Sequence, residues 1–304
     1  MMPSFAGDAQ DEENGEISEF IQGFGCVGYV ADRALATAAY LLVRLSKPLL
    51  IEGHAGVGKT EVAKALASYL KTKLIRLQCY EGLDAHSALY EWNYQKQLLA
   101  IRIRERSDKP VEELERHIFG DDFLLKRPLL QSILCESFSP VLLIDEIDRA
   151  DEAFEAFLLE ILSEFQVTIP ELGTVQAKRI PHVILTSNST RELSDALKRR
   201  CLYHWIDYPS LEKETEIVRT RLPEFDHELG SRVVRFMQLV RRMNLSKPPG
   251  VAETLDLSQA LMLLKKKVFD PETAGEILGC VLKSADDLAK IRDEGVGNLL
   301  SRAG

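Results

Sequence analysis

Short apolar runs alternate with longer amphipathic stretches from about residue 24 to residue 208. The runs at 48–52, 141–144 and 183–187 are largely apolar, which is typical of strands buried in a parallel sheet. The stretch 154–165 has apolar residues at i, i+3, i+4 and i+7 spacing, which predicts a helix with one buried face. The pattern predicts an α/β domain over residues 24–208, with helices on both faces of a parallel sheet.

A purely helical pattern follows the boundary that Tyr208-Pro209 marks. Prolines separate four stretches with helical periodicity, which are 211–222, 230–243, 251–268 and 273–293. They predict a small all-α lid domain of about four helices over residues 209–304. At the other end, residues 1–23 are acidic and contain no Lys or Arg, which predicts a disordered, solvating tail.

A glycine-rich loop connects the first apolar run to a helical stretch. Its eight residues are Gly53, His54, Ala55, Gly56, Val57, Gly58, Lys59 and Thr60. This G-x-x-x-x-G-K-T spacing, between a strand and a helix, predicts a phosphate loop that binds a nucleoside triphosphate. Backbone N–H groups would surround the phosphates, Lys59 would reach the β- and γ-phosphates, and the Thr60 hydroxyl would bind magnesium.

Polar side chains follow two of the other predicted strands. Asp145 and Glu146 end the run that begins at Val141, and Asn188 follows the run 183–187. Ligands of open parallel sheets bind at the carboxyl ends of the strands. We therefore expect Asp145 to hold magnesium, Glu146 to polarise the attacking water, and Asn188 to orient that water.

Two further features complete the order of motifs. A short helical stretch ends in Arg199 and Arg200, which could supply positive charge to a phosphate. Before Asn188, the segment 166–175 has two β-prone runs around a glycine, which predicts a hairpin.

Phosphate loop, acidic pair, polar strand end and arginine pair occur in the order of Walker A, Walker B, sensor 1 and arginine finger. The chain therefore resembles the AAA+ ATPases, and the hairpin before sensor 1 resembles their MoxR branch. Segments 77–84, 91–99 and 199–209 look like the CoxD-like members of that branch. One departure concerns residues 250–254, where typical MoxR lids carry a sensor 2 arginine and this chain has none.

The resemblance implies ATP and Mg²⁺ as ligands and a ring, expected to be a hexamer, in which Arg200, with Arg199, acts on a neighbouring subunit. It also implies a client metalloenzyme, a molybdenum hydroxylase, and a von Willebrand A-type partner. Gly28 and Tyr29 lie where many AAA+ proteins hold the adenine base. The aromatic residues Tyr80, Tyr90, Trp92 and Tyr94 leave two alternatives open, client contact and plain packing.

Composition narrows the choice of function. The net charge of −9 argues against a nucleic-acid partner, because binding to a phosphate backbone needs a clustered basic surface. No run approaches the length of a membrane span and no signal peptide is apparent, so the expected location is cytoplasmic. Five cysteines without a Cys-x-x-Cys pair predict reduced thiols. Besides client remodelling, two alternatives remain, a nucleotide-gated regulatory subunit and, least favoured, a DNA-remodelling motor.

Overall fold

The computed structural model describes residues 6–104 and 118–303. Two compact units make up the chain. The first combines residues 1–36, 53–65 and 205–304, and the second combines residues 37–52 and 66–204. The phosphate loop thus belongs to the same unit as the C-terminal helices. The domain bounds 24–208 and 209–304 stay a prediction.

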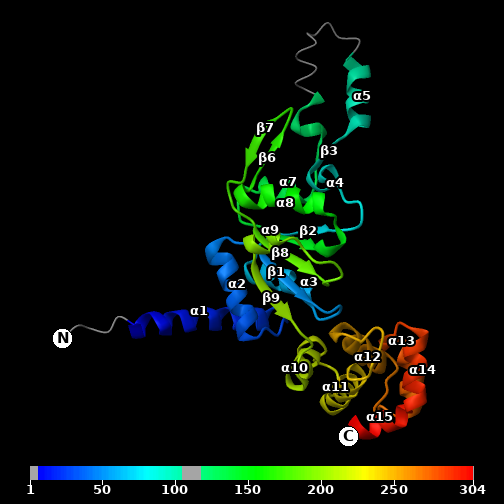
Figure 1. Ribbon diagram of the computed structural model, residues 1–304. Helices are drawn as coiled ribbons and strands as arrows, with labels where there is room; N and C mark the ends of the chain where they lie inside the picture. Colours follow the sequence, from blue (N-terminus) through cyan, green and yellow to red (C-terminus); the bar gives the residue numbers. More distant parts are fainter. Residues whose placement is uncertain (1–5, 105–117, 304) are drawn as a thin grey trace, which may run out of the picture. The chain divides into compact units, whose positions relative to one another are not determined.

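The second unit is built on a five-stranded sheet with the order β2-β5-β8-β1-β9 (Figure 1). The strands are β1 Leu49–Gly53, β2 Leu74–Gln78, β5 Val141–Asp145, β8 His182–Ser187 and β9 Leu202–Ile206. The pairs β2–β5, β5–β8 and β8–β1 are parallel. Every residue of β5 is buried, as expected for a central strand covered on both faces. The predicted parallel sheet is confirmed.

Helices complete this layered structure. They include α2 Arg33–Leu45, α3 Lys59–Tyr69, α7 Pro128–Ile133, α8 Glu152–Glu164 and α9 Asp195–Arg200. Helix α8 begins where the Asp151 carboxylate accepts a hydrogen bond from the Phe154 N–H at 2.8 Å. It ends at Phe165, whose left-handed backbone stops the helix. The predicted buried face of this helix is correct, because Phe154, Leu158 and Ile161 are in the core.

Two hairpins extend the second unit. Strands β6 Gln166–Ile169 and β7 Gly173–Gln176 pair antiparallel, which confirms the hairpin predicted before Asn188. A second pair, β3 Tyr90–Trp92 and β4 Leu124–Lys126, lies between α4 Ala85–Leu89 and α5 Tyr94–Arg104 in Figure 1, and the short helix η1 Asp121–Phe123 leads into β4.

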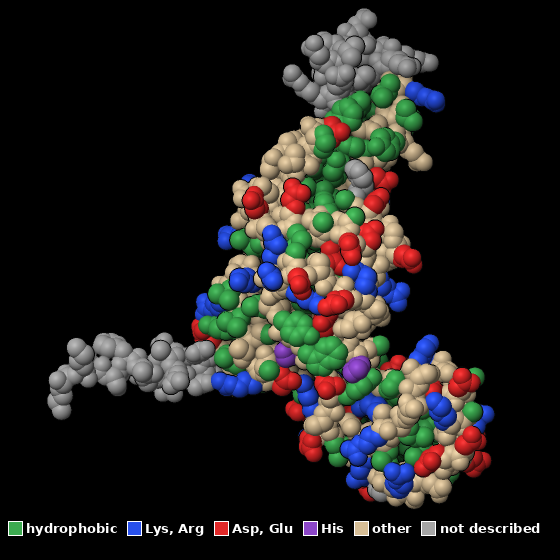
Figure 2. All heavy atoms as spheres, in the orientation of Figure 1, with side chains coloured by type: hydrophobic (Ala, Val, Ile, Leu, Met, Phe, Trp, Pro, Cys, Tyr) green, Lys and Arg blue, Asp and Glu red, His purple; other side chains and the backbone are tan. Residues whose placement is uncertain are grey.

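The aromatic residues of this region divide into two groups. Tyr90 and Trp92 are buried, and the Trp92 ring packs edge-on against Tyr90 and Phe119. Tyr80 and Tyr94 are 50% and 64% exposed. Hydrophobic side chains are prominent over α5 in Figure 2. Packing therefore accounts for two of the four aromatic residues, and exposure leaves the other two available for contact.

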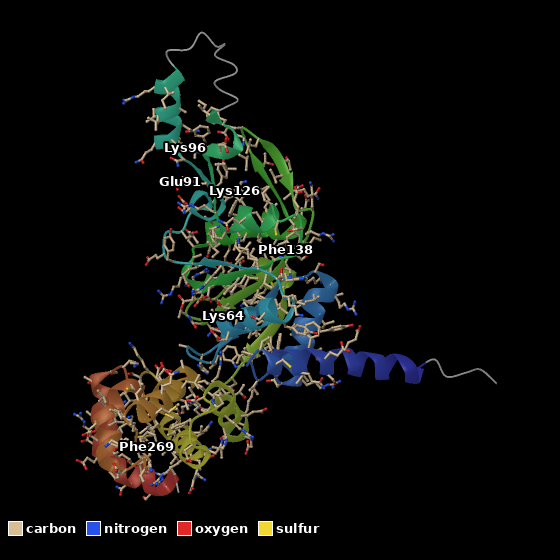
Figure 3. The ribbon with its side chains drawn as sticks, turned by 180° about the vertical axis from the view of Figure 1, so that it is seen from behind. Lys64, Glu91, Lys96, Lys126, Phe138 and Phe269 are labelled. Atoms are coloured by element: carbon tan, nitrogen blue, oxygen red, sulfur yellow. The ribbon has the colours of Figure 1, made fainter. Side chains whose placement is uncertain are left out.

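The C-terminal part of the first unit contains six helices among the described residues. They are α10 Leu211–Arg221, α11 His227–Arg241, α12 Val251–Leu263, α13 Pro271–Val281, α14 Ala285–Glu294 and α15 Val296–Ala303. The prediction of about four helices was wrong, because the stretch 273–293 breaks at residues 282–284 and a further helix follows Gly295. Phe269, labelled in Figure 3, packs edge-on against Phe236 in the core of these helices.

The N-terminal segment forms helix α1, Ala6–Cys26. The prediction of a disordered tail over residues 1–23 was therefore wrong for its described part. The reason is an apolar series at helical spacing, because Ile17, Phe20 and Phe24 are all buried. Acidic composition alone had indicated disorder, but these three side chains give the helix a face to bury.

Candidate functional site

The phosphate loop leaves β1 at Gly53 and ends in the first turn of α3. Gly56 and Gly58 have φ values of 76° and 94°, which side chains with a Cβ rarely adopt. A Cβ at Gly53 would lie 2.2 Å from the Ile206 carbonyl oxygen, so this position also requires glycine. The glycines of the motif thus have steric reasons in this fold.

Lys59 lies inside the curve of the loop. Its ammonium group donates hydrogen bonds to the carbonyl oxygens of Gly53 at 2.8 Å and His54 at 2.7 Å, and the residue is 7% exposed. Thr60 is the next residue of α3 and is half-buried. The N-terminus of α3 adds partial positive charge at the same point, which favours an anion such as a phosphate.

The other loop residues contact the C-terminal segment of the same unit or are exposed. The His54 ring stacks on Tyr208, with 4.6 Å between ring centroids and 6° between planes, and its edge meets Trp205. Ala55 is exposed and Val57 is buried. The stacking of His54 on Tyr208, which lies 154 positions later in the chain, is visible only in the fold.

Gly28 and Tyr29, the predicted adenine contacts, lie in the same unit as the phosphate loop. Gly28 has a φ of 78°, which requires glycine. The Tyr29 ring packs edge-on against Phe24. Burial raises the pKa of the Tyr29 hydroxyl, and the negative charges of Asp32 and Glu61 raise it further. Glu61 follows the loop in α3, so Tyr29 lies near the start of that helix.

Asp145 is the last residue of β5, in the second unit. Its carboxylate is buried, accepts a hydrogen bond from the Thr186 hydroxyl at 2.5 Å, and forms an ion pair with Arg76 of β2 at 2.5 Å. A carboxylate oxygen is a ligand type that magnesium accepts, and in this structure Thr186 and Arg76 occupy the two oxygens of Asp145. Thr186 and Arg76 were not identified from the sequence, because their role depends on which strands are neighbours.

Glu146 lies just beyond the same strand end and has a left-handed backbone with φ 56°. Its carboxylate accepts hydrogen bonds from the side-chain amides of Asn188 at 3.4 Å and Gln78 at 3.0 Å, and it pairs with Arg149 at 3.0 Å. The structure thus brings together Glu146 and Asn188, which are separated in the sequence. Gln78 was missed, although its position at the carboxyl end of β2 was a usable signal.

Asp148 is the residue that stands where MoxR proteins typically have asparagine. It is buried and accepts hydrogen bonds from the backbone N–H groups of Asn188 at 3.2 Å and Thr190 at 3.1 Å, and from the Thr190 hydroxyl at 2.6 Å. Burial acts to raise the pKa of Asp148, but these hydrogen bonds outweigh it and the pKa is lowered. Asp148 therefore fixes the loop that carries Asn188.

Arg199 and Arg200 form the last turn of α9, and both are exposed. Arg200 donates hydrogen bonds to the Ser163 hydroxyl at 3.0 Å and the Ala196 carbonyl oxygen at 3.3 Å. Arg199, Arg200 and Glu146 all lie within the described residues, and no hydrogen bond joins either arginine to Glu146. Within one chain, the structure does not bring these arginines together with the acidic pair.

The remaining candidate features of residues 6–104 and 118–303 are reactive thiols, clusters of metal-binding side chains and membrane-spanning helices. The cysteines in this part of the chain are free thiols, and burial raises the pKa of both Cys79 and Cys201 to about 12. No group of three or more His, Cys, Asp or Glu residues is arranged to hold a metal ion there. No helix there is long and apolar enough to cross a membrane.

Comparisons with known proteins extend these observations. An uncharacterized protein of Staphylococcus haemolyticus is 25% identical over 239 residues, which cover 76% of this chain and 82% of that protein. Among solved structures, a RuvB mutant of Thermotoga maritima has a TM-score of 0.46 at 16% identity, covering 81% of this chain and 67% of its own. Domain III of the replication initiation protein DnaA from the same organism has a TM-score of 0.47 at 14% identity, covering 84% and 96%.

One family matches more than half of the chain. Its description is AAA domain (dynein-related subfamily), and the match covers residues 48–201. This range begins at the strand before the phosphate loop, includes the acidic pair and the β6–β7 hairpin, and ends just after Arg200. Together with the parallel sheet it confirms the predicted P-loop AAA+ fold class. The chain belongs to the AAA domain family, in its dynein-related subfamily.

Proposed function

We propose that this protein hydrolyses ATP to ADP and phosphate in a magnesium-dependent reaction. The observation that carries the proposal is the pairing of the Glu146 carboxylate with the Asn188 amide at the ends of β5 and β8. A carboxylate and an amide side by side can hold one water molecule, the carboxylate as proton acceptor and the amide as donor. The phosphate loop lies within the family match and is the proposed binding site of the nucleotide that this water attacks.

Each residue has a separate role in this mechanism. Lys59 exchanges the carbonyl oxygens of its own loop for the β- and γ-phosphates, and the loop N–H groups hold the other oxygens. Thr60 and Asp145 would hold magnesium, which neutralises charge on the phosphates when bound. Glu146 accepts the proton of the attacking water, and Asn188 orients that water. Asp148 keeps Asn188 in place.

The direct test of this function is Glu146→Gln. The variant keeps the shape and the hydrogen-bonding capacity of the side chain but cannot accept a proton, so we expect ATP turnover to fall by about a hundredfold or more while ATP binding persists. Phosphate release and equilibrium binding of ATP measure the two properties. Glu160→Gln, an exposed position on α8, is the matched control and should keep full turnover. Undiminished hydrolysis by Glu146→Gln would contradict the assignment.

Arg200, assisted by Arg199, is proposed to act on the nucleotide of a neighbouring subunit in a ring, which the resemblance suggests is a hexamer. The support is the exposure of both side chains at the end of α9 and the lack of a hydrogen bond to Glu146 in their own chain, both within the described residues. An arginine supplied by a neighbour typically accelerates phosphoryl transfer by about 10³ to 10⁵. Hydrolysis would then depend on assembly.

We further propose that the ring remodels or matures a client metalloenzyme in the cytoplasm, and that the client is a molybdenum hydroxylase. This proposal rests on the resemblance to CoxD-like members of the MoxR branch. Glu146→Gln, which should hold ATP without hydrolysing it, is a suitable bait in native extract. Retention of a molybdenum hydroxylase subunit, lost in Lys59→Ala, is the expected result. Retention of a von Willebrand A-type protein alone would favour a regulatory subunit, and retention of DNA-processing proteins alone would refute both assignments.

A further inference from the structure

The first turn of α12 is hydrogen-bonded to the phosphate loop within the first unit. The backbone N–H groups of Val251 and Ala252 donate to the Gly56 carbonyl oxygen at 2.9 Å and 3.2 Å. They are the first two N–H groups of α12, and such groups have no acceptor within their own helix. Gly56 therefore supplies an acceptor that this helix end needs.

The two backbones approach so closely that each side of the contact requires glycine. A Cβ at Gly250 would lie 2.7 Å from the Gly56 Cα and 2.8 Å from the Ala55 carbonyl oxygen. A Cβ at Gly56 would lie 3.1 Å from the Gly250 Cα, and the Gly56 φ of 76° disfavours side chains in any case. No other residue type fits at position 250 without moving the loop or the helix.

A buried ion pair holds the turn that carries Gly250. Arg241 and Glu214 are 5% and 0% exposed, and the Arg241 guanidinium binds both carboxylate oxygens of Glu214. The same guanidinium donates to the carbonyl oxygens of Pro249 at 2.7 Å and Gly250 at 3.1 Å. A bidentate pair of this kind is geometrically specific, so the turn has one well-defined position relative to α10 and α11.

The contact also determines the orientation of one peptide group in the loop. The Gly56 carbonyl and the Val57 N–H belong to one trans peptide plane and point in opposite directions. When α12 holds the carbonyl on one side, the N–H is presented on the other. Two donors on the carbonyl also polarise the peptide and strengthen its N–H as a donor.

We propose that the first turn of α12 is a positioning element for the nucleotide site, in which its backbone N–H groups hold the Gly56–Val57 peptide in one orientation. The proposal rests on the proposed function, because it assumes that this loop binds nucleotide phosphates. It accounts for the glycine at position 250, where a Cβ would meet the backbone of the phosphate loop. By linkage, a nucleotide that favours this peptide orientation also tightens the attachment of α12.

The test compares ADP binding by the wild-type protein with binding by two variants, using a fluorescent ADP analogue. Gly250→Ala places a methyl group against the Gly56 backbone, and we expect its ADP affinity to fall by about tenfold or more. Val251→Pro removes one N–H donor, and proline is well tolerated at the first helical position after an extended residue such as Gly250. Its affinity should fall by about fivefold.

Gly275→Ala is the matched control, because a Cβ there meets nothing within 4 Å and the residue lies in a helix of the same unit. It should bind ADP like the wild type. Hydrogen exchange provides a local measurement, and both variants should exchange faster in residues 53–60 and 250–254 with the other helices unchanged. Wild-type affinity and exchange in both variants would overturn this inference alone. A wild-type protein that binds no ADP would overturn the proposed function and this inference with it.

Discussion

At the residue scale, the two acidic residues that end β5 have different surroundings and can therefore do different work. Asp145 is buried and ion-paired with Arg76, so its negative charge is fixed in place. Glu146 is partly exposed and accepts hydrogen bonds from side chains of three other residues, which orient it without burying it. Asp145 is therefore held in one position, whereas Glu146 remains accessible to a small molecule such as water.

Asp148 offers a residue-scale prediction. Asp148→Ala removes the acceptor for three hydrogen bonds and leaves the donors of Asn188 and Thr190 unpaired, so we expect it to lower the free energy of unfolding by about 2–3 kcal/mol. Asp148→Asn keeps one acceptor oxygen and should cost about 1 kcal/mol. Chemical denaturation of both variants measures these differences. Equal stability of all three proteins would contradict the role given to Asp148.

The same residue sets a pH dependence. The pKa of Asp148 is lower in the folded state than its ordinary value of 3.8, so its contribution to stability is present above pH 3.8 and is lost as pH falls through the folded pKa. The stability advantage of the wild type over Asp148→Asn should therefore shrink below pH 3.8. An advantage that stays constant into more acidic solution would show that the charge of Asp148 does not matter.

At the scale of elements, the sequence predicted those whose signal is local. The phosphate loop, β5, β8 and the hairpin of β6 and β7 all have their pattern within a few residues. Strand order is not local, so the ion pair of Arg76 with Asp145 could not be predicted, whereas the position of Gln78 at the carboxyl end of β2 was a usable signal for its contact with Glu146. At α1 the acidic composition predicted disorder, but Ile17, Phe20 and Phe24 give this helix a buried apolar face. The attachment of α12 to Gly56 is made by backbone groups, and the glycine that it requires at position 250 is compatible with many turns, so the sequence did not predict this contact.

The hairpin of β3 and β4 allows the aromatic residues to be tested at this scale. Trp92 is 6% exposed between Tyr90 and Phe119, so Trp92→Ala should lower the free energy of unfolding by about 3–5 kcal/mol. Tyr94 is 64% exposed, and Tyr94→Ala should change it by less than about 0.5 kcal/mol. Thermal and chemical unfolding measure both. A Trp92→Ala protein of normal stability that no longer retains a client would favour contact over packing.

At the scale of the whole molecule, the proposed function assigns nucleotide binding to the phosphate loop and activation of water to Glu146 and Asn188. Among the described residues, the proposed arginine finger, Arg200, contacts Ser163 and Ala196 and not the acidic pair of its own chain. This separation of Arg200 from the acidic pair is the structural reason to expect that ATP hydrolysis depends on a second copy of the chain.

Mixing two inactive variants tests that expectation. Lys59→Ala should not bind nucleotide but still presents Arg200, whereas Arg200→Ala binds nucleotide but lacks the arginine. In an equal mixture that exchanges subunits, about a quarter of the interfaces of a ring pair an intact site with an intact arginine. Phosphate release should then recover to about that fraction of wild-type activity, although neither variant is active alone. Activity of Arg200→Ala on its own would show that this arginine is not required. An inactive mixture, with subunit exchange demonstrated by labelled chains, would place both groups in one chain.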